Sequence, residues 1–555
     1  MYDDSYPVID QYLTDVNVGA RKQRNIRDNI FVLGAVTNSV INGKQPAIQA
    51  QVMDVDTCFD KLWLQQAINA LFEDGLTNDT LNILYEENKN AQIAIKVNDK
   101  ITRRVNIQEI IIQGSVWGSL KCTAIMDKLN KLILQEPQAI YHYKNDPSIQ
   151  IGVLGMVDDT LSISECGTTS VTKNAIINSF VENQRLTLSN VKSVVIHIGS
   201  ENKCKVTCPK LKVHEQTMKI ATSAKYLGDV VSGRGVQDTI ESRIEKGWGK
   251  VSQILGLLAE IPSGPHRIKM AIKMREALLC SSMLLNSEAW SDLKESQIDK
   301  MEVVDRSLIR SLVEAHSKTP KEFLYLEVGV LKFRHLIMIR RMTYHHQILQ
   351  RDDEETTKKI YMKQTQQNCK GDWYRLLLED FKFINEVINE DKIISYSKDA
   401  YKKIIKQKVK EAAFRQYLSE KEVNKKKLGD ITYHAFNVQP YLTNKNFTRK
   451  EINLLHRLRS KCHPAKMNFR KMHKNNLKCS LNCDSLETQK HIFEECRPII
   501  NKIKLTTHCK IDQVFGSVTD QKEAIQVFIQ IEEARKKLVK SFLPGEQVAR
   551  TPPDH

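Results

Sequence analysis

Segments in which apolar and polar residues alternate, and which lead into aspartates, constrain the fold of this 555-residue chain more than any other feature. Residues 48–53 alternate in this way and end at Asp54. Residues 149–153 begin a second segment, which reaches Asp158-Asp159 and reverses into the alternating residues 160–164. A period of two residues predicts β-strands. We therefore expect three carboxylates at the ends of strands of one sheet.

Helical patterns complete the order of elements around these strands. One helix is expected from Leu62 to Phe72, with Gly75 as its C-cap, and a longer helix over residues 115–134. A helix around residues 176–181 and a strand over 194–198 follow. The resulting β-α-β-β-α-β order predicts an α+β fold built on a split βαβ antiparallel sheet, with helices on one face.

The remainder of the chain is predicted to be mainly helical. One apolar stripe runs from Ile240 to Leu258, Pro262 and Gly264 interrupt it, and helical patterns continue to about residue 395. A basic region, a group of cysteines and a last amphipathic helix follow. Upstream, residues 92–97 form one further strand-like segment.

The net charge of +17 is concentrated in one part of the chain. Residues 401–480 contain 21 Lys or Arg against 5 Asp or Glu, a surplus of 16. Charge runs are commonly solvated helix faces. A surplus beside a Cys/His group instead favours a surface that binds a polyanion.

Most of the twelve cysteines are irregularly spaced, which does not suggest a disulfide framework. One group is compact, with the spacing Cys479-x3-Cys483-x7-His491-x4-Cys496. Three thiolates and an imidazole suit one tetrahedral, structural Zn²⁺. The polar N-terminus and the lack of a long apolar run predict an intracellular, soluble protein of the nucleus or cytoplasm, with no membrane partner.

The carboxylates Asp54, Asp158 and Asp159 point to divalent cations. Aspartate is common in turns, so the pair Asp158-Asp159 has little meaning alone. Three clustered carboxylates disfavour joint ionisation unless a cation neutralises them. Mg²⁺ prefers oxygen ligands, and two such ions can activate a 3′-hydroxyl and stabilise leaving pyrophosphate.

Five motifs in order resemble those of reverse transcriptases from non-LTR retrotransposons. Residues 54–60 (Asp-Val-Asp-Thr-Cys-Phe-Asp) are similar to motif A, D-x-x-x-A-F-D, and residues 156–159 (Met-Val-Asp-Asp) to the [FY]-x-D-D box of motif C. Gln113-Gly114-Ser115 resembles motif B, residues 188–193 motif D, and Tyr226-Leu227-Gly228 motif E. The resemblance covers about residues 10–300, and the cysteine group resembles the zinc knuckle near the C-terminus of such elements.

The resemblance implies a right-hand polymerase palm, a helical thumb and a set of site residues. Asp54, Asp158 and Asp159 would hold two Mg²⁺ ions, and Lys192 of motif D would approach the triphosphate. Phe59 would block a ribose 2′-hydroxyl, and Gln113 and Gly114 would bind substrate. The residues implied in nucleic-acid binding before the knuckle are Arg457, Arg459, Lys461, Lys466 and Arg470.

Departures from the family are few. Met156 stands where motif C has an aromatic residue, Cys58 where motif A has alanine, and Ile112 where proline precedes Gln-Gly. None of them removes a metal ligand. Only 18 residues precede Gly19-Ala20-Arg21, which is similar to a stretch that follows fingers motifs in the family, so incomplete fingers and weak polymerisation are expected.

The predicted domains follow from these features. They are a fingers remnant (1–47), a palm (48–232), a helical thumb (233–350), a helical connection with the basic region (351–478), a zinc knuckle (479–496), an amphipathic C-terminal helix (497–542) and a disordered tail (543–555).

The leading hypothesis is an RNA-directed DNA polymerase of a mobile element. Its partners would be an RNA template, a DNA primer or target, and deoxynucleoside triphosphates, and its oligomeric state is left open. A catalytically silent nucleic-acid-binding remnant is the alternative. An RNA-directed RNA polymerase is disfavoured by Val157, where such enzymes carry glycine, and by Phe59.

Overall fold

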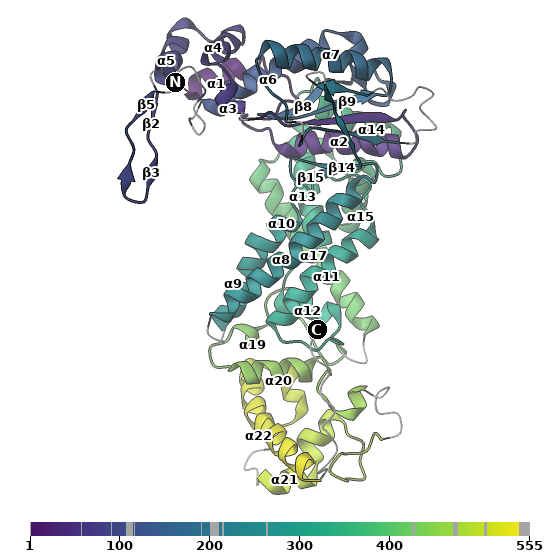
Figure 1. Ribbon diagram of the computed structural model, residues 1–555. Helices are drawn as coiled ribbons and strands as arrows, with labels where there is room; N and C mark the ends of the chain where they lie inside the picture. The colour runs from purple at the N-terminus through teal and green to yellow at the C-terminus, as the bar shows by residue number, and fades with distance from the viewer. Residues whose placement is uncertain are drawn as a thin grey trace. The chain divides into compact units, whose positions relative to one another are not determined.

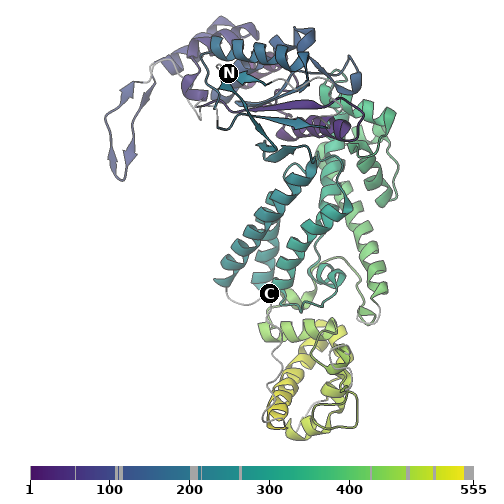
Figure 2. The same ribbon diagram turned by 45° about the vertical axis from the view of Figure 1, so that its right-hand side comes forward.

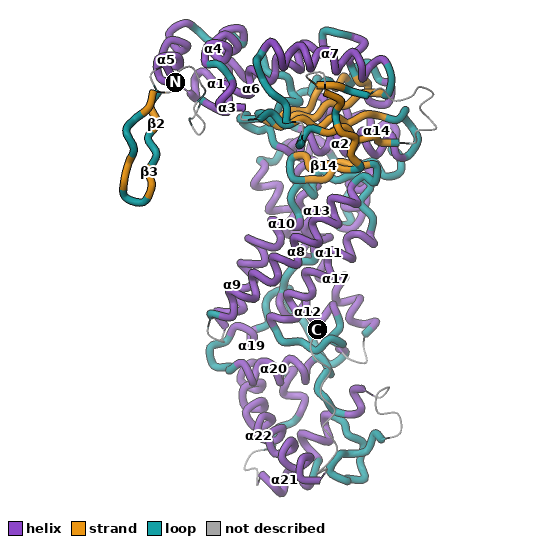
Figure 3. Tube along the Cα trace, in the orientation of Figure 1, coloured by secondary structure: helices purple, strands orange, loops and turns teal. Residues whose placement is uncertain are grey.

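The computed structural model describes residues 2–542, except 57, 90, 107–110, 112–114, 116, 190, 200–209, 214–215, 262–264, 425–427, 470–475 and 504–507. The described chain forms two compact units. The first, here called the sheet unit, comprises Met1–Ser242, Asn286–Lys294 and Arg340–Lys402. The second, the helical unit, comprises Arg243–Leu285, Glu295–Ile339 and Lys403–His555. All strands assigned within the described residues belong to the sheet unit (Figure 3).

A five-stranded sheet is the centre of the sheet unit (Figure 1). Its order is β13 (Lys219–Ala221), β10 (Val194–Ile198), β1 (Ile48–Met53), β9 (Asp159–Glu165) and β8 (Val153–Met156). Strand β1 pairs antiparallel with both β9 and β10, and β9 pairs antiparallel with β8. Strands β1 and β8 therefore run in the same direction with β9 between them. The predicted α+β sheet and its aspartate-bearing hairpin are confirmed.

Helices cover both faces of this sheet. In Figures 1 and 2, α6 (Gly118–Leu134) and α7 (Thr168–Asn183) lie on one side, and α2 (Ile26–Ile41) lies on the other. The predicted helices α6 and α7 thus share one face as expected, and α2, which lies upstream of the predicted order of elements, covers the other face. Because both faces are covered, all six residues of β1 are buried, the polar ones included. Gln51, for example, donates a hydrogen bond to Asn174 of α7 (3.1 Å).

Helix α2 is held by residues distant in sequence. Phe31 packs edge-on against Tyr344 of α13 (Phe333–Leu349) and Trp373 of α15 (Trp373–Phe383). Tyr344 also donates a hydrogen bond to Asp28 (2.8 Å). Residues 340–402 therefore belong with the sheet, and the predicted boundary at residue 350 does not separate compact units.

The sheet unit contains further helices and short strands. They are α1 (Tyr2–Asp10), α3 (Cys58–Lys61), α4 (Leu64–Glu73), α5 (Asn78–Lys89), β2 (Gln92–Ile93), β3 (Lys96–Val97), β4 (Lys100–Ile101), β5 (Val105–Asn106), β6 (Tyr141–His142), β7 (Gln150–Ile151), β11 (Lys212–Val213), β12 (Gln216–Thr217), β14 (Ser223–Tyr226), β15 (Asp229–Ser232), α14 (Thr356–Gln367) and α16 (Glu390–Ile394).

The described part of the helical unit contains mainly helices, as predicted. They are most of α8 (Val236–Ala259) and α17 (Lys398–Val423), with α9 (Pro265–Met274), α10 (Ser281–Met283), α11 (Glu295–Leu312), α12 (Lys321–Val328), α19 (Pro440–Thr443), α20 (Arg449–Arg459), α21 (Arg497–Ile503) and α22 (Val518–Phe542). The segment predicted as one C-terminal helix over 497–542 contains the separate helices α21 and α22. The predicted disordered tail, 543–555, lies outside the described residues.

One predicted strand is divided in the structure. Residues 149–156 are not one strand, because β7 ends at Ile151 and β8 begins at Val153. Between them, a Cβ on Gly152 would lie 2.1 Å from Asn130 Oδ1, and that oxygen accepts a hydrogen bond from Val153 N (2.9 Å). The side chain of Asn130 from α6 thus occupies the space beside Gly152, between β7 and β8.

A buried lysine joins α7 to the sheet. Lys173 is fully buried, and its Nζ donates hydrogen bonds to the carbonyl oxygens of Gly152 (3.0 Å) and Ile163 (2.5 Å). Burial lowers the pKa of Lys173 to about 7. The folded state therefore releases this proton at a lower pH than the unfolded chain does.

This difference predicts a pH-dependent stability. Between about pH 7 and pH 10 the unfolded chain binds the Lys173 proton and the folded chain does not, so the free energy of unfolding should rise with pH. The slope contributed is at most about 1.4 kcal/mol per pH unit. Urea unfolding of the full chain at pH 7, 8 and 9 should show a steeper rise for the wild type than for Lys173→Met. Parallel curves would contradict this role for Lys173.

Candidate active site

Strand pairing brings the three predicted carboxylates to one edge of the sheet. Asp54 directly follows β1, and Met53 at the end of β1 pairs with Thr160 of β9. Asp159 begins β9 and pairs with Met156, so Asp158 lies in the two-residue turn between β8 and β9. Asp54, Asp158 and Asp159 are here called the carboxylate cluster.

The β8–β9 turn is held in an unfavourable backbone conformation. Val157 has a φ of 60°, a region that β-branched residues rarely adopt, and such positions cost on the order of 1–3 kcal/mol. A neighbouring segment restrains it. Val18 N donates to the Gly155 carbonyl (2.9 Å), and a Cβ on Gly19 would lie 2.5 Å from Val157 N. A side chain at position 19 would therefore displace the turn.

Strand β8 is also supported by Tyr226, in the segment that resembles motif E. Tyr226 is buried, and its hydroxyl donates to the carbonyl oxygen of Leu154 (2.8 Å). Asn29 of α2 donates to the Gly155 carbonyl (3.0 Å). These contacts place the turn that carries Asp158 on the buried core.

The segment similar to motif D lies against the end of β1. Ser189 N donates to the Asp54 carbonyl (2.9 Å), and Asp54 N donates to Ser193 Oγ (3.2 Å). Lys192 Nζ lies 3.1 Å from Asp54 Oδ2. Two segments more than 130 residues apart in sequence therefore meet, and Lys192 faces the carboxylate cluster.

The electrostatics of the cluster follow from crowding of like charges. Asp159 is exposed, yet partial burial by the surrounding atoms raises its pKa, and the charges of Asp158 and Asp54 raise it further. The hydrogen bond to Asp54, together with the charge of that carboxylate, raises the pKa of Lys192. Asp54, Asp158 and Asp159 thus disfavour joint ionisation, and carboxylate oxygens are the kind of ligand that Mg²⁺ prefers.

The other residues singled out from the sequence in this region are Phe59, Gln113, Gly114 and Cys58. Phe59 is half-buried at the start of α3 and packs on the core of the sheet unit. Gln113 and Gly114 lie outside the described residues. Cys58, noticed in the sequence only as a departure from alanine, is buried with its Sγ 3.4 Å from Cys122 Sγ of α6. This sulfur contact packs the start of α3 on α6.

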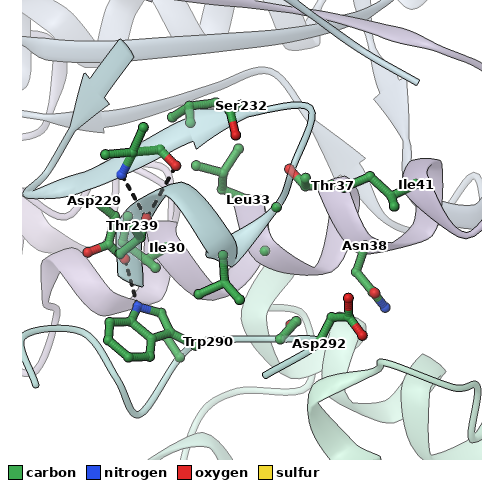
Figure 4. A pocket seen from close by; sticks show the side chains of 17 residues that line it. Ile30, Leu33, Thr37, Asn38, Ile41, Asp229, Ser232, Thr239, Trp290 and Asp292 are labelled. Atoms are coloured by element: carbon green, nitrogen blue, oxygen red, sulfur yellow. Dashed lines mark hydrogen bonds between the residues drawn. The ribbon is translucent and has the colours of Figure 1, made fainter. Parts of the chain in front are cut away.

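A separate pocket of about 60 Å³ lies elsewhere in the sheet unit (Figure 4). It is bounded by α2, β15 and residues 289–292. Trp290 Nε1 donates to Asp229 Oδ2 (2.8 Å) on one side of it. None of its lining residues belongs to the carboxylate cluster or to the other predicted site residues.

In the helical unit, the four predicted zinc ligands come together. The ligand atoms of Cys479, Cys483, His491 and Cys496 all lie within 4.8 Å of one another. Cys496 Sγ is 3.9 Å from Cys479 Sγ and 3.8 Å from Cys483 Sγ. Zinc–sulfur bonds of about 2.3 Å in a tetrahedron separate two sulfurs by about 3.8 Å. Both ring nitrogens of His491 are buried without a hydrogen bond to a described residue, so the donor set fits Zn²⁺.

Glu487, which sequence reasoning missed, supports the loop that carries two of these ligands. Its buried carboxylate accepts hydrogen bonds from Ser480 N (2.8 Å) and Ser480 Oγ (2.6 Å), and pairs with Arg535 of α22 (3.0 Å). Burial alone would raise the pKa of Glu487, but Arg535 and Ser480 hold it below its usual value. The loop between Cys479 and His491 is thereby attached to α22.

Some of the cations predicted to contact nucleic acid are buried or paired with acidic residues, and so are not free to bind phosphates. Arg459 is 3% exposed, and its Nη2 lies 2.9 Å from the carboxylate of buried Glu327. The assignment of Arg459 to a nucleic-acid surface was therefore wrong, because its charge is neutralised inside the fold. Lys461 pairs with Asp430 (2.7 Å).

The other three predicted cations differ in their surroundings. Arg457 is half-buried, Lys466 donates to the Lys478 carbonyl (2.9 Å), and Arg470 lies outside the described residues. Arg457, Lys461 and Lys466 keep part of their side chains accessible.

Comparison with known proteins identifies the part of the chain that contains the carboxylate cluster. Residues 7–231 match the family model described as reverse transcriptase (RNA-dependent DNA polymerase). This part of the chain is therefore similar to reverse transcriptase domains, a family described as RNA-dependent DNA polymerases. No protein with a curated description matches the chain.

Solved structures of telomerase show a distant likeness. Apo telomerase from Candida tropicalis matches at 10% identity and a TM-score of 0.33, over 74% of this chain and 60% of that one. A form of that enzyme truncated from the C-terminal domain matches at 12% identity and a TM-score of 0.26, over 38% of each chain. Telomerase from Candida albicans, in complex with the TWJ fragment of telomeric RNA, matches at 11% and 0.32, over 57% and 53%. The chain thus covers 38–60% of these telomerase chains.

Within the described part of the chain, no helix combines the length and the apolar composition needed to span a bilayer.

The cysteine–histidine geometry predicts metal-dependent local folding. The purified full chain should contain one zinc per molecule. Cys483→Ser should lose it and increase hydrogen exchange across residues 476–496, because a structural zinc contributes its binding free energy to folding. Cys369→Ser, at a half-buried cysteine of the sheet unit, is the matched control and should retain zinc. Unchanged metal content in Cys483→Ser would exclude the four residues as a zinc site.

Proposed function

We propose that this chain is the polymerase portion of a non-LTR mobile-element reverse transcriptase. It adds deoxynucleotides to the 3′-hydroxyl of a DNA primer or target on an RNA template. The observation that supports this most strongly is the meeting of Asp54 with Asp158 and Asp159 at one sheet edge. That edge belongs to the domain that matches reverse transcriptases.

Asp54, Asp158 and Asp159 would hold two Mg²⁺ ions in this proposal. When bound, the ions make the primer hydroxyl more acidic and neutralise charge on the leaving pyrophosphate. The chain's own contribution is positioning. The β8–β9 turn is restrained by Gly19 and Tyr226, and misplacing a reactant by about 1 Å can cost roughly 10²-fold in rate.

Two further side chains would act on the incoming nucleotide. Lys192 carries a raised pKa, so it is protonated at neutral pH and offers positive charge beside the carboxylate cluster. Phe59, five residues after Asp54, would exclude a ribose 2′-hydroxyl. Gln113 and Gly114 are proposed as substrate-binding residues on the resemblance alone.

The C-terminal part would bind nucleic acid. A zinc knuckle of Cys479, Cys483, His491 and Cys496 would keep its loop folded. The accessible parts of Arg457, Lys461 and Lys466, with Arg470, would contact phosphates of the RNA template or target DNA.

The first test of this function is primer extension. Asp54→Asn, Asp158→Asn and Asp159→Asn should each lower the extension rate on the order of 10³-fold, about 4 kcal/mol of transition-state stabilisation, with template binding nearly unchanged. The control is Asp79→Asn, which removes an exposed carboxylate of α5.

The outcomes of that test separate the two hypotheses from the sequence. Extension at wild-type rate by Asp158→Asn would refute the carboxylate assignment. A wild-type chain that binds template–primer but never extends it would favour a silent nucleic-acid-binding remnant.

Sugar selection is the second test. Phe59→Ala should admit ribonucleotides that the wild type rejects, since removing one group from a tight pocket changes discrimination by roughly 10–200-fold. The ratio of kcat/KM for deoxy- and ribonucleotides measures this. Phe72→Ala, at an exposed phenylalanine of α4, should leave the ratio unchanged. The same ratio in wild type and Phe59→Ala would make Phe59 a packing residue only.

A further inference from the structure

A hairpin arm formed by residues 92–106 projects from the rest of the sheet unit (Figures 1 and 2). Strand β2 pairs with β5, and β3 pairs with β4. All residues of the arm are exposed. A single two-stranded hairpin is marginally stable in water, so an arm of this length gains from a surface to lie on.

The arm exposes several large apolar side chains to solvent. Ile95, Val97 and Ile101 are 61%, 60% and 68% exposed, and Ile93 and Val105 are also more than half exposed. Contiguous exposed apolar residues, particularly on an edge strand, mark surfaces that contact a partner.

The charge of the arm indicates which kind of partner it fits. It carries four cations, Lys96, Lys100, Arg103 and Arg104, against the single acid Asp99. None of the four forms an ion pair with a residue that the structure describes. The arm therefore presents a net charge of +3 that the fold does not neutralise.

The two arginines of this set lie in a bulge of the hairpin. Ile93 pairs with Val105 and Lys96 with Ile101, so two residues on the first strand oppose three on the second, Thr102, Arg103 and Arg104. The hydroxyl of Thr102 accepts a hydrogen bond from Ile95 N (2.9 Å) at this position. Bulges bend a strand and re-aim its side chains, and they are common beside functional sites.

We propose that the arm is a nucleic-acid-binding element. Its four cations contact the sugar–phosphate backbone of the template–primer, and its aliphatic side chains pack on the sugars. Guanidinium and ammonium groups are the usual phosphate contacts, and they make binding salt-dependent. This inference rests on the proposed function for the identity of the substrate, but the binding itself can be measured without catalysis.

The test compares two full-chain variants that lose the same charge. In the arm variant, Lys96, Lys100, Arg103 and Arg104 are changed to Gln. In the control, the exposed cations Lys370, Arg375, Lys382 and Lys392 of the same unit are changed to Gln. The probe is a fluorescently labelled RNA strand annealed to a shorter DNA primer, and RNA alone is measured in parallel.

The arm variant should bind the hybrid about 10-fold or more weakly at 0.1 M salt. Its slope of log K against log salt should be shallower than that of the wild type by up to about 3, because each phosphate contact contributes roughly 0.7–0.9. The control should retain most of both. Equal losses in the two variants would show a general charge effect, and no loss in the arm variant would show no contact; either result overturns the proposal.

Crosslinking tests the occupant directly. A photoreactive benzophenone amino acid placed at Val97 should crosslink to the labelled RNA or DNA on irradiation. Crosslinks only to a protein chain would overturn the proposal in favour of a protein partner. A chain that crosslinks and binds but never extends a primer would refute the proposed polymerase activity and leave this inference standing.

Discussion

The pairing of β1 on both of its edges is the constraint on which the rest of the site depends. A strand with neighbours on both sides and helices on both faces has one possible register with its core, because a slip of one residue would reverse every side chain. Asp54, as the residue after this strand, is therefore fixed at the sheet edge. The antiparallel pairing of β9 with β1 then brings Asp159 to the same edge. Its position is set by strand pairing and does not depend on the conformation of a loop.

Two unfavourable features meet at that edge, and each is opposed by contacts from distant segments. Crowded carboxylates raise the pKa of Asp159, and the backbone of Val157 occupies a region disfavoured for valine. Such features persist where the surroundings over-determine them. Here the backbone groups of Val16 and Val18 bond to Gly155, and the segment similar to motif D bonds to both backbone groups of Asp54. The sheet and two flanking segments together therefore define the positions of these residues.

Local periodicity explains why the aspartates could be predicted, and its limits explain what was missed. The alternation that reveals β1 and the β8–β9 hairpin depends only on neighbouring residues. Arg459 was assigned to a nucleic-acid surface from its basic neighbours in the sequence. Its partner Glu327 lies 132 positions away, so the local sequence pattern cannot reveal the ion pair. The packing of Phe31 on Trp373, which assigns residues 340–402 to the sheet unit, is equally invisible in the sequence. The zinc ligands were predictable because their spacing is compact, whereas Glu487 has no such signature.

The buried position of Arg459 shows that the net charge of the chain overstates the positive charge available to bind a polyanion. A formal surplus of charge counts every cation, although some neutralise acids inside the fold. In the helical unit Arg459 pairs with Glu327 and Arg275 with Asp305, each pair buried, and such cations cannot reach a phosphate without breaking the core. Breaking a buried pair typically costs about 3–5 kcal/mol, more than a single surface phosphate contact returns. Available charge is therefore set by exposure and pairing more than by sequence density. By that measure the arm of residues 92–106, whose four cations are all exposed and outside any ion pair with a described residue, offers polyanions more per residue than its short length suggests.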